Sequence, residues 1–73
     1  MPYVNIKITR EGGPDGVGPD HDQKARLIAG VTAVLRDVLG KSPATTFILI
    51  EEAALEDWGI GGMPVEDYRR AAR

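Results

Sequence analysis

The sequence predicts an α+β domain in which a βαβ unit with parallel strands is followed by a short C-terminal hairpin. Three observations predict this class. Residues 3–9 alternate apolar and polar side chains, residues 20–39 repeat apolar side chains at the helical period, and residues 45–52 form a second strand-like run. Strands joined by a long crossover that carries a helix are parallel, and the crossover is almost always right-handed.

The first strand is expected at Tyr3–Thr9, where alternate apolar side chains share one face. The following segment, REGGPDGVGPD, contains four glycines and two prolines, so we expect a loop. Asp20 is the expected N-cap of the helix, and Gln23, three residues later, completes a capping box. The helix is predicted to reach Leu39 and to end at Gly40, because glycine favours the left-handed conformation of a C-cap.

The second strand is expected within TTFILIEE, residues 45–52. Residues 47–50 are apolar without alternation, which indicates that both faces of this strand are covered. The helix can cover one face, and a second subunit is the natural candidate for the other. Three glycines within WGIGG predict a tight turn or short hairpin. The tail after Pro64 is expected either to form a helical turn or to fray.

The length of 73 residues predicts one domain spanning residues 1–73. A core this small rarely supplies more than about 3–5 kcal/mol of stability. The chain has no cysteine for a disulfide, and one histidine cannot build a structural zinc site, so self-association is the expected source of further stability. The net charge of −2, and the lack of a long apolar run or signal-peptide pattern, predict a cytoplasmic protein without nucleic-acid or membrane partners.

Most polar side chains give no catalytic signal. His21, at the start of the helix, and the single serine, Ser42, form no evident set with a base, and the glycine-rich loop lacks phosphate-loop spacing. The acidic pair at residues 51–52 is expected to face water or a neighbouring subunit. The arginines near the C-terminus are expected to be solvated or to pair across an interface; these are Arg69, Arg70 and Arg73.

Pro2 is the residue with a specific chemical possibility. Removal of Met1 would turn its nitrogen into a free secondary amine, whereas with Met1 attached it is a tertiary amide without a basic lone pair. An α-amino group titrates near about pH 7.7–8.0, and apolar surroundings or a nearby cation lower that pKa. Such an amine would be a suitable base at neutral pH. The alternative is a proline that simply begins a strand.

The order PYVNIKI, an amphipathic helix containing Gln-Lys, a strand and WGIGG resembles the 4-oxalocrotonate tautomerase family over nearly the whole chain. The resemblance implies a βαβ unit that dimerises into a four-stranded sheet with helices on one face. It also implies assembly of three dimers into a homohexamer. In that family the N-terminal proline is the general base that moves a proton between carbons of an enol or dienol and its ketone. No cofactor is used, and the implied setting is aromatic catabolism.

The resemblance assigns Pro2 as the catalytic base. Trp58 stands where the family has a pocket aromatic, the alternative being a core or interface tryptophan, and the turn that contains Ile60 would border the pocket. The family's two substrate-binding arginines are replaced, one by Gly12 and one by Phe47. Since phenylalanine cannot clamp a carboxylate, a doubly anionic substrate is not expected. The predicted substrate-binding residues are Arg10, Phe47, Trp58 and Ile60. The alternatives are a solvated loop charge at Arg10 and a core side chain at Phe47.

The resemblance, together with these residues, implies a cofactor-independent tautomerase that acts on a small 2-oxo or 2-hydroxy unsaturated carboxylic acid. Two alternatives stay open. One is a dehalogenase or hydratase of unsaturated acids, which needs a water-activating carboxylate near the proline, with Glu52 and Glu56 as candidates. The other is a non-catalytic oligomerising module, which retention of Met1 would favour. The loop at residues 12–19 is expected to act as a flap near Pro2 or to alter subunit packing.

Overall fold

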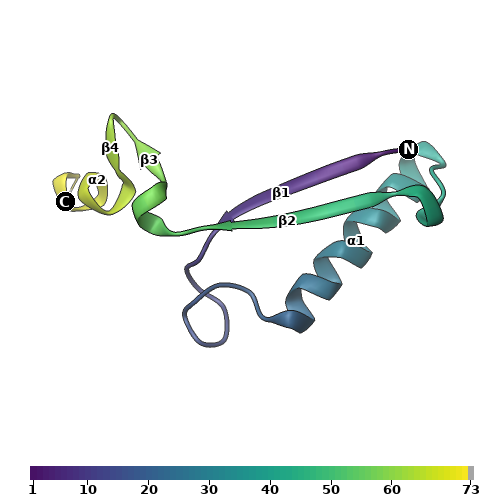
Figure 1. The fold of residues 1–73 in the computed structure, drawn as a ribbon, viewed down its shortest axis with the longest axis horizontal. Helices are drawn as coiled ribbons and strands as arrows, with labels where there is room; N and C mark the ends of the chain where they lie inside the picture. Colours follow the sequence, from purple (N-terminus) through teal and green to yellow (C-terminus); the bar gives the residue numbers. More distant parts are fainter. Residues whose placement is uncertain (73) are drawn as a thin grey trace.

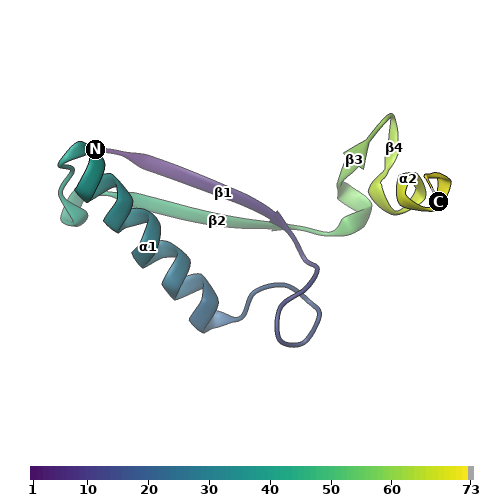
Figure 2. The ribbon, with the colours of Figure 1, turned by 180° about the vertical axis from the view of Figure 1, so that it is seen from behind.

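The predicted βαβ unit is present in the computed structural model, which describes residues 1–72; Arg73 of the predicted arginine cluster lies outside them. Strand β1 (Tyr3–Thr9) pairs in parallel with β2 (Phe47–Ala53), in a register that runs from Tyr3 beside Phe47 to Thr9 beside Ala53. Helix α1 (His21–Leu39) crosses one face of this two-stranded sheet, and its C-terminal end lies near the start of β1 (Figures 1 and 2). The fold class is confirmed.

Both ends of α1 follow the predicted capping chemistry. The backbone N–H of Gln23 donates to Asp20 Oδ1 at 2.8 Å, and the backbone N–H of Asp20 donates to Gln23 Oε1 at 3.1 Å. Two of the backbone donors that an N-terminus leaves without helical partners are therefore satisfied. At the other end Gly40 has a φ of 68°, the left-handed conformation that glycine adopts at no steric cost.

Strand β2 begins two residues later than the sequence predicts. Residues Pro43–Thr45 form a short 3-10 helix, η1, instead of the first part of the strand. Ser42 caps it, because its Oγ accepts from the backbone N–H of Ala44 at 3.3 Å, and its carbonyl oxygen accepts from Thr46 Oγ1 at 2.8 Å. Local hydrogen bonds of serine and threonine compete here with strand pairing.

The C-terminal segment forms a separate small unit beyond the end of β2 (Figure 1). After a 3-10 turn, η2 (Leu55–Asp57), the predicted hairpin is present as β3 (Gly59–Ile60) and β4 (Met63–Pro64). The two turn glycines have φ values of 64° and 82°, as a tight hairpin turn requires. The tail forms helix α2 (Val65–Ala71), so the helical alternative is confirmed.

The single chain has almost no core. Within residues 1–72, Val65 is the buried hydrophobic residue, with 8% of its surface exposed. Burial alternates along β2: the side chains at 48 and 50 are half-buried towards α1, whereas Phe47 and Leu49 are 53% and 44% exposed on the opposite face. One chain therefore covers one face of β2, and the second face that the sequence predicts to be covered is open.

The chain is also more extended than a compact domain. Its radius of gyration is 15.6 Å and its dimensions are 46 × 27 × 17 Å, whereas a compact domain of this length has a radius of gyration of about 11 Å. No helix within the described part of the chain is long and apolar enough to cross a membrane.

Candidate active site

Pro2 lies at the head of β1, where the sheet fixes its backbone. Its carbonyl oxygen accepts a hydrogen bond of 3.0 Å from the backbone N–H of Phe47, so the strand pairing extends to this residue. The proline is half-buried, whereas Met1 in front of it is 86% exposed. Removal of Met1 would therefore unmask the Pro2 nitrogen while disturbing few contacts.

Phe47 is the one predicted substrate-binding residue that lies beside Pro2 within the same chain. The parallel register places Phe47 next to Tyr3, and both side chains are largely exposed on the sheet face away from α1. The position where the family has an arginine is thus occupied here by an exposed aromatic ring at the start of the sheet.

Arg10 and the hairpin residues lie towards the end of the β1–β2 sheet that is opposite Pro2. Arg10 directly follows β1, and its backbone N–H donates to the carbonyl of Ala53 at 2.9 Å. Eight residues of extended chain separate it from Pro2, which corresponds to about 26 Å. Trp58 and Ile60 belong to the hairpin unit beyond β2 and are 38% and 45% exposed. One chain therefore does not bring the five predicted site residues together.

The hairpin itself is well ordered by local contacts. The carbonyl of Trp58 accepts from the backbone N–H of Val65 at 2.8 Å. Gly61 packs so closely on the ring of Tyr68 that a Cβ placed on it would lie 3.0 Å from two ring carbons. Trp58 and Ile60 are thus held on a defined turn whose glycines have backbone roles.

The carboxylates considered for a hydratase or dehalogenase are not near Pro2 of the same chain. Glu52 pairs in register with Ile8, about 20 Å along the strand from Pro2. Its Oε1 lies 2.7 Å from Lys24 Nζ, and its Oε2 lies 3.9 Å from Arg10 Nε. Glu56 follows β2 in η2, farther along still. Glu52 therefore pairs with cations of its own chain. It is not placed to activate a water molecule at Pro2 of that chain.

The loop between β1 and α1 folds back on itself beside Arg10. The N–H of Gly18 donates to the carbonyl of Gly12 at 2.8 Å, and Gly18 is buried. A Cβ on Gly13 would lie 1.9 Å from the carbonyl oxygen of Gly18, so this approach requires glycine. Because the loop stands at the opposite end of β1 from Pro2, it does not cover the proline of its own chain.

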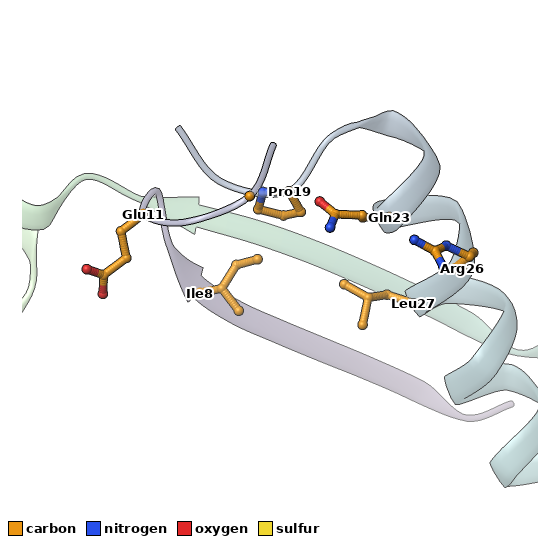
Figure 3. A pocket seen from close by; sticks show the side chains of 7 residues that line it. Ile8, Glu11, Pro19, Gln23, Arg26 and Leu27 are labelled. Atoms are coloured by element: carbon orange, nitrogen blue, oxygen red, sulfur yellow. The ribbon is translucent and has the colours of Figure 1, made fainter. Parts of the chain in front are cut away.

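A pocket of about 460 Å³ lies between this loop, the end of β1 and the first half of α1. Figure 3 shows Ile8 and Leu27 facing each other across it, with Gln23 beside them. The pocket contains none of the five predicted site residues; its lining residues are Ile8, Glu11, Gly13, Pro19, Gln23, Arg26 and Leu27.

One ion pair that sequence reasoning missed ties the C-terminal unit to this loop. Two guanidinium nitrogens of Arg69 donate to the two carboxylate oxygens of Glu11 at 3.0 and 3.1 Å, and Thr9 Oγ1 donates to the same carboxylate at 3.0 Å. The hydrogen bonds from Arg69 and, to a smaller extent, from Thr9 hold the pKa of the Glu11 carboxyl below its usual value. The hydrogen bond to Glu11 in turn raises the pKa of Arg69. Arg70 pairs with Asp67 of its own helix. These two arginines therefore pair within the chain.

Comparisons with known proteins agree with this fold. The family described as Tautomerase enzyme matches residues 2–68. A probable tautomerase K2 of Dickeya dadantii is 49% identical over 72 residues, which cover 99% of this chain and 98% of that protein. The crystal structure of DmpI from Helicobacter pylori superimposes with a TM-score of 0.79 at 36% identity, covering 94% of this chain and 97% of that one.

A second solved structure, YwhB, is described as a homologue of 4-oxalocrotonate tautomerase. It matches with a TM-score of 0.73 at 27% identity, covering 90% of this chain and 97% of that one. Sequence relationship and fold thus lead to the same conclusion: the chain belongs to the tautomerase family, that of 4-oxalocrotonate tautomerase and its homologues.

Proposed function

We propose that this single-domain chain is a cofactor-independent tautomerase in which Pro2, freed of Met1, is the general base. The amine removes a proton from a small 2-hydroxy unsaturated acid and returns it to a carbon atom, which converts the enol to its ketone. Membership of the tautomerase family supports this class of reaction. The observation that carries the proposal is the position of Pro2, which is held by the sheet behind a single exposed residue.

The proposed enzyme is a homo-oligomer, because one chain leaves its apolar faces open. Phe47 and Leu49 are exposed on one face of the sheet, and α1 exposes Val34 and Val38 at 58% and 75%. At about 25 cal/mol per Å² of apolar surface removed from water, covering these faces is the main stabilisation available to a chain without a core. The proposed assembly is a hexamer built as a trimer of dimers.

Assembly also bears on the active site. Arg10 lies about 26 Å along the strand from Pro2 of the same chain, so a carboxylate cannot reach both groups in one copy. In the proposed site Pro2 of one copy works with Arg10 and Trp58 of another. Trp58, Ile60 and Phe47 would supply apolar walls that exclude water and lower the pKa of the amine.

The substrate we propose carries one carboxylate at the recognition end. Arg10 offers a planar fork that fits a carboxylate, and its side chain is 58% exposed. Phe47 supplies no second cation and is better suited to an apolar or aromatic substituent. An enol such as phenylenolpyruvate therefore fits the site better than a dicarboxylate such as 2-hydroxymuconate.

The test replaces Pro2 by alanine in a sample whose intact mass proves that Met1 has been removed. General acid–base catalysis contributes about 10²- to 10⁴-fold in rate, so we expect kcat for phenylenolpyruvate ketonisation to fall by that factor. Asp37→Ala is the control, because Asp37 is 63% exposed on α1 and has no role in the proposed site, and it should retain full turnover. Unchanged turnover in Pro2→Ala would remove Pro2 from the mechanism.

A further inference from the structure

Glu52 lies between two cations of its own chain, and they compete for one carboxylate. Lys24 Nζ is 2.7 Å from Oε1, whereas Arg10 Nε is 3.9 Å from Oε2. The side chain of Glu52 is 21% exposed, compared with 40% for Lys24 and 58% for Arg10. Buried Gly18 of the adjacent loop lies next to the carboxylate, since a Cβ there would be in van der Waals contact with Oε1 at 3.9 Å.

The geometry decides which cation neutralises the carboxylate. Coulomb attraction falls with the inverse of distance, so at equal screening the Lys24 contact is about 1.4 times stronger than the Arg10 contact. Arg10 is also the more exposed of the two, and solvent screens its attraction further. Lys24 is thus the nearer counter-ion of Glu52, by distance and not by a hydrogen bond to the buried Oε1. The Arg10–Glu52–Lys24 group retains a net positive charge located at Arg10.

The Arg10 guanidinium is in turn available for a ligand. Within residues 1–72 its contact with an acidic group is the 3.9 Å approach of Nε to Glu52, which is longer than a hydrogen bond and therefore does not occupy the guanidinium fork. A guanidinium binds a carboxylate most strongly through two parallel N–H···O bonds. If Glu52 took Arg10 as its main partner, this fork would be occupied by a protein carboxylate.

We propose that Lys24 is a positioning residue for substrate recognition: it holds Glu52 and thereby keeps the Arg10 guanidinium free for the substrate carboxylate. This inference deepens the proposed function and rests on its role for Arg10. Without Lys24, a mostly covered Glu52 carboxylate would have Arg10 as its remaining cation, because leaving a shielded charge without a partner is costly. The substrate would then compete with Glu52 for Arg10.

The first experiment measures KM and kcat of Met-processed Lys24→Met. Competition from Glu52 would cost the substrate carboxylate its charge-assisted hydrogen bonds to Arg10, so we expect KM to rise at least about tenfold while kcat changes less than about twofold. Lys24→Arg should restore the wild-type KM, because it keeps a cation beside Glu52. Lys41→Met, in the exposed turn after α1, removes the same charge elsewhere and should leave KM unchanged.

The second experiment adds Glu52→Gln to Lys24→Met, which removes the competing carboxylate. We expect KM of this double variant to return to within about threefold of wild type. A purely structural role for the Lys24–Glu52 pair would give the opposite result, since removing both partners would not restore binding. A double variant as weak as Lys24→Met, or a Lys24→Met variant with wild-type KM, would overturn the proposal.

A binding measurement separates this inference from the assignment of the base. Calorimetry with 3-phenylpropanoate, a carboxylate that cannot tautomerise, should give a Kd that follows the same pattern across the four variants. If Pro2→Ala kept full turnover, the proposed mechanism would fail while this Kd pattern stood. If the Kd values of Lys24→Met and wild type were equal, the role of Lys24 would be refuted whatever the role of Pro2.

Discussion

Retention of Met1 is predicted to abolish catalysis without disturbing the fold. Two samples of one sequence are compared: one with Met1 removed, and one with Met1 kept by inhibiting methionine aminopeptidase during expression. Met1 is 86% exposed, so only about one seventh of its surface is covered. Because full burial of a methionine side chain is worth about 1.5–3 kcal/mol, the covered part contributes only about 0.2–0.4 kcal/mol.

The chemical effect is an order of magnitude larger. An acylated Pro2 nitrogen has no basic lone pair, so the retained sample loses the general base, which is worth about 10²- to 10⁴-fold in rate, or about 2.7–5.4 kcal/mol of transition-state stabilisation. Ketonisation is followed by the loss of enol absorbance, and melting temperatures are compared in parallel. Equal activity of two samples with verified masses would refute the reasoning, and a lower melting temperature of the retained sample would show that Met1 acts on the fold.

Three further predictions concern the fold. Asp20→Ala removes the acceptor of the capping box and should cost about 1 kcal/mol, or about 4–8 °C in melting temperature, whereas Asp20→Asn should stay near wild type. Gly13→Ala should be less stable to urea than Gly16→Ala, because both have positive φ and only the former would meet the carbonyl of Gly18; equal losses would contradict the close approach. Leu49→Glu should reduce the mass measured by sedimentation, and an unchanged assembly would mean that the open sheet face is not a subunit contact.

Much of the fold could be predicted because the capping and turn residues interact with groups that are close to them in the sequence. Asp20 and Gln23 are three residues apart, Gly40 acts through its own backbone, and the Trp58–Gly62 turn is defined by glycines that adopt positive φ. The start of β2 was predicted too early. Thr45 has high strand propensity, but hydrogen bonds around Ser42 form a 3-10 helix there, and such local competition has no signature in apolar periodicity.

The charged contacts could not be read from the sequence. Glu11 and Arg69 are 58 residues apart, and Lys24 meets Glu52 across the sheet–helix layer. Exposed charged side chains have no periodic pattern, and only the tertiary fold decides which of them meet. The candidate site was even harder to predict from the sequence, because Pro2 and Arg10 lie at opposite ends of one strand. In the proposed site they come from different copies, and no pattern within a single chain encodes that geometry.

The Glu11–Arg69 pair predicts an acid-sensitive position of the hairpin unit. Hydrogen bonds from Arg69 and Thr9 lower the pKa of Glu11 in the folded chain. The pair therefore stabilises the fold fully above the unfolded pKa of about 4.3, and this contribution is lost as pH falls through the lower folded pKa. Trp58 is the single tryptophan and reports on the hairpin, so its fluorescence should shift on acidification.

A matched pair of variants identifies the cause of that shift. Arg69→Gln at neutral pH should reproduce the acid spectrum of Trp58 and flatten its pH dependence, because the carboxylate then has no guanidinium partner. Arg70→Gln removes an equal charge one residue away, where the partner is Asp67 of the same helix, and should keep the wild-type profile. Identical profiles for the two variants would mean that net charge, and not the contact with Glu11, governs the hairpin.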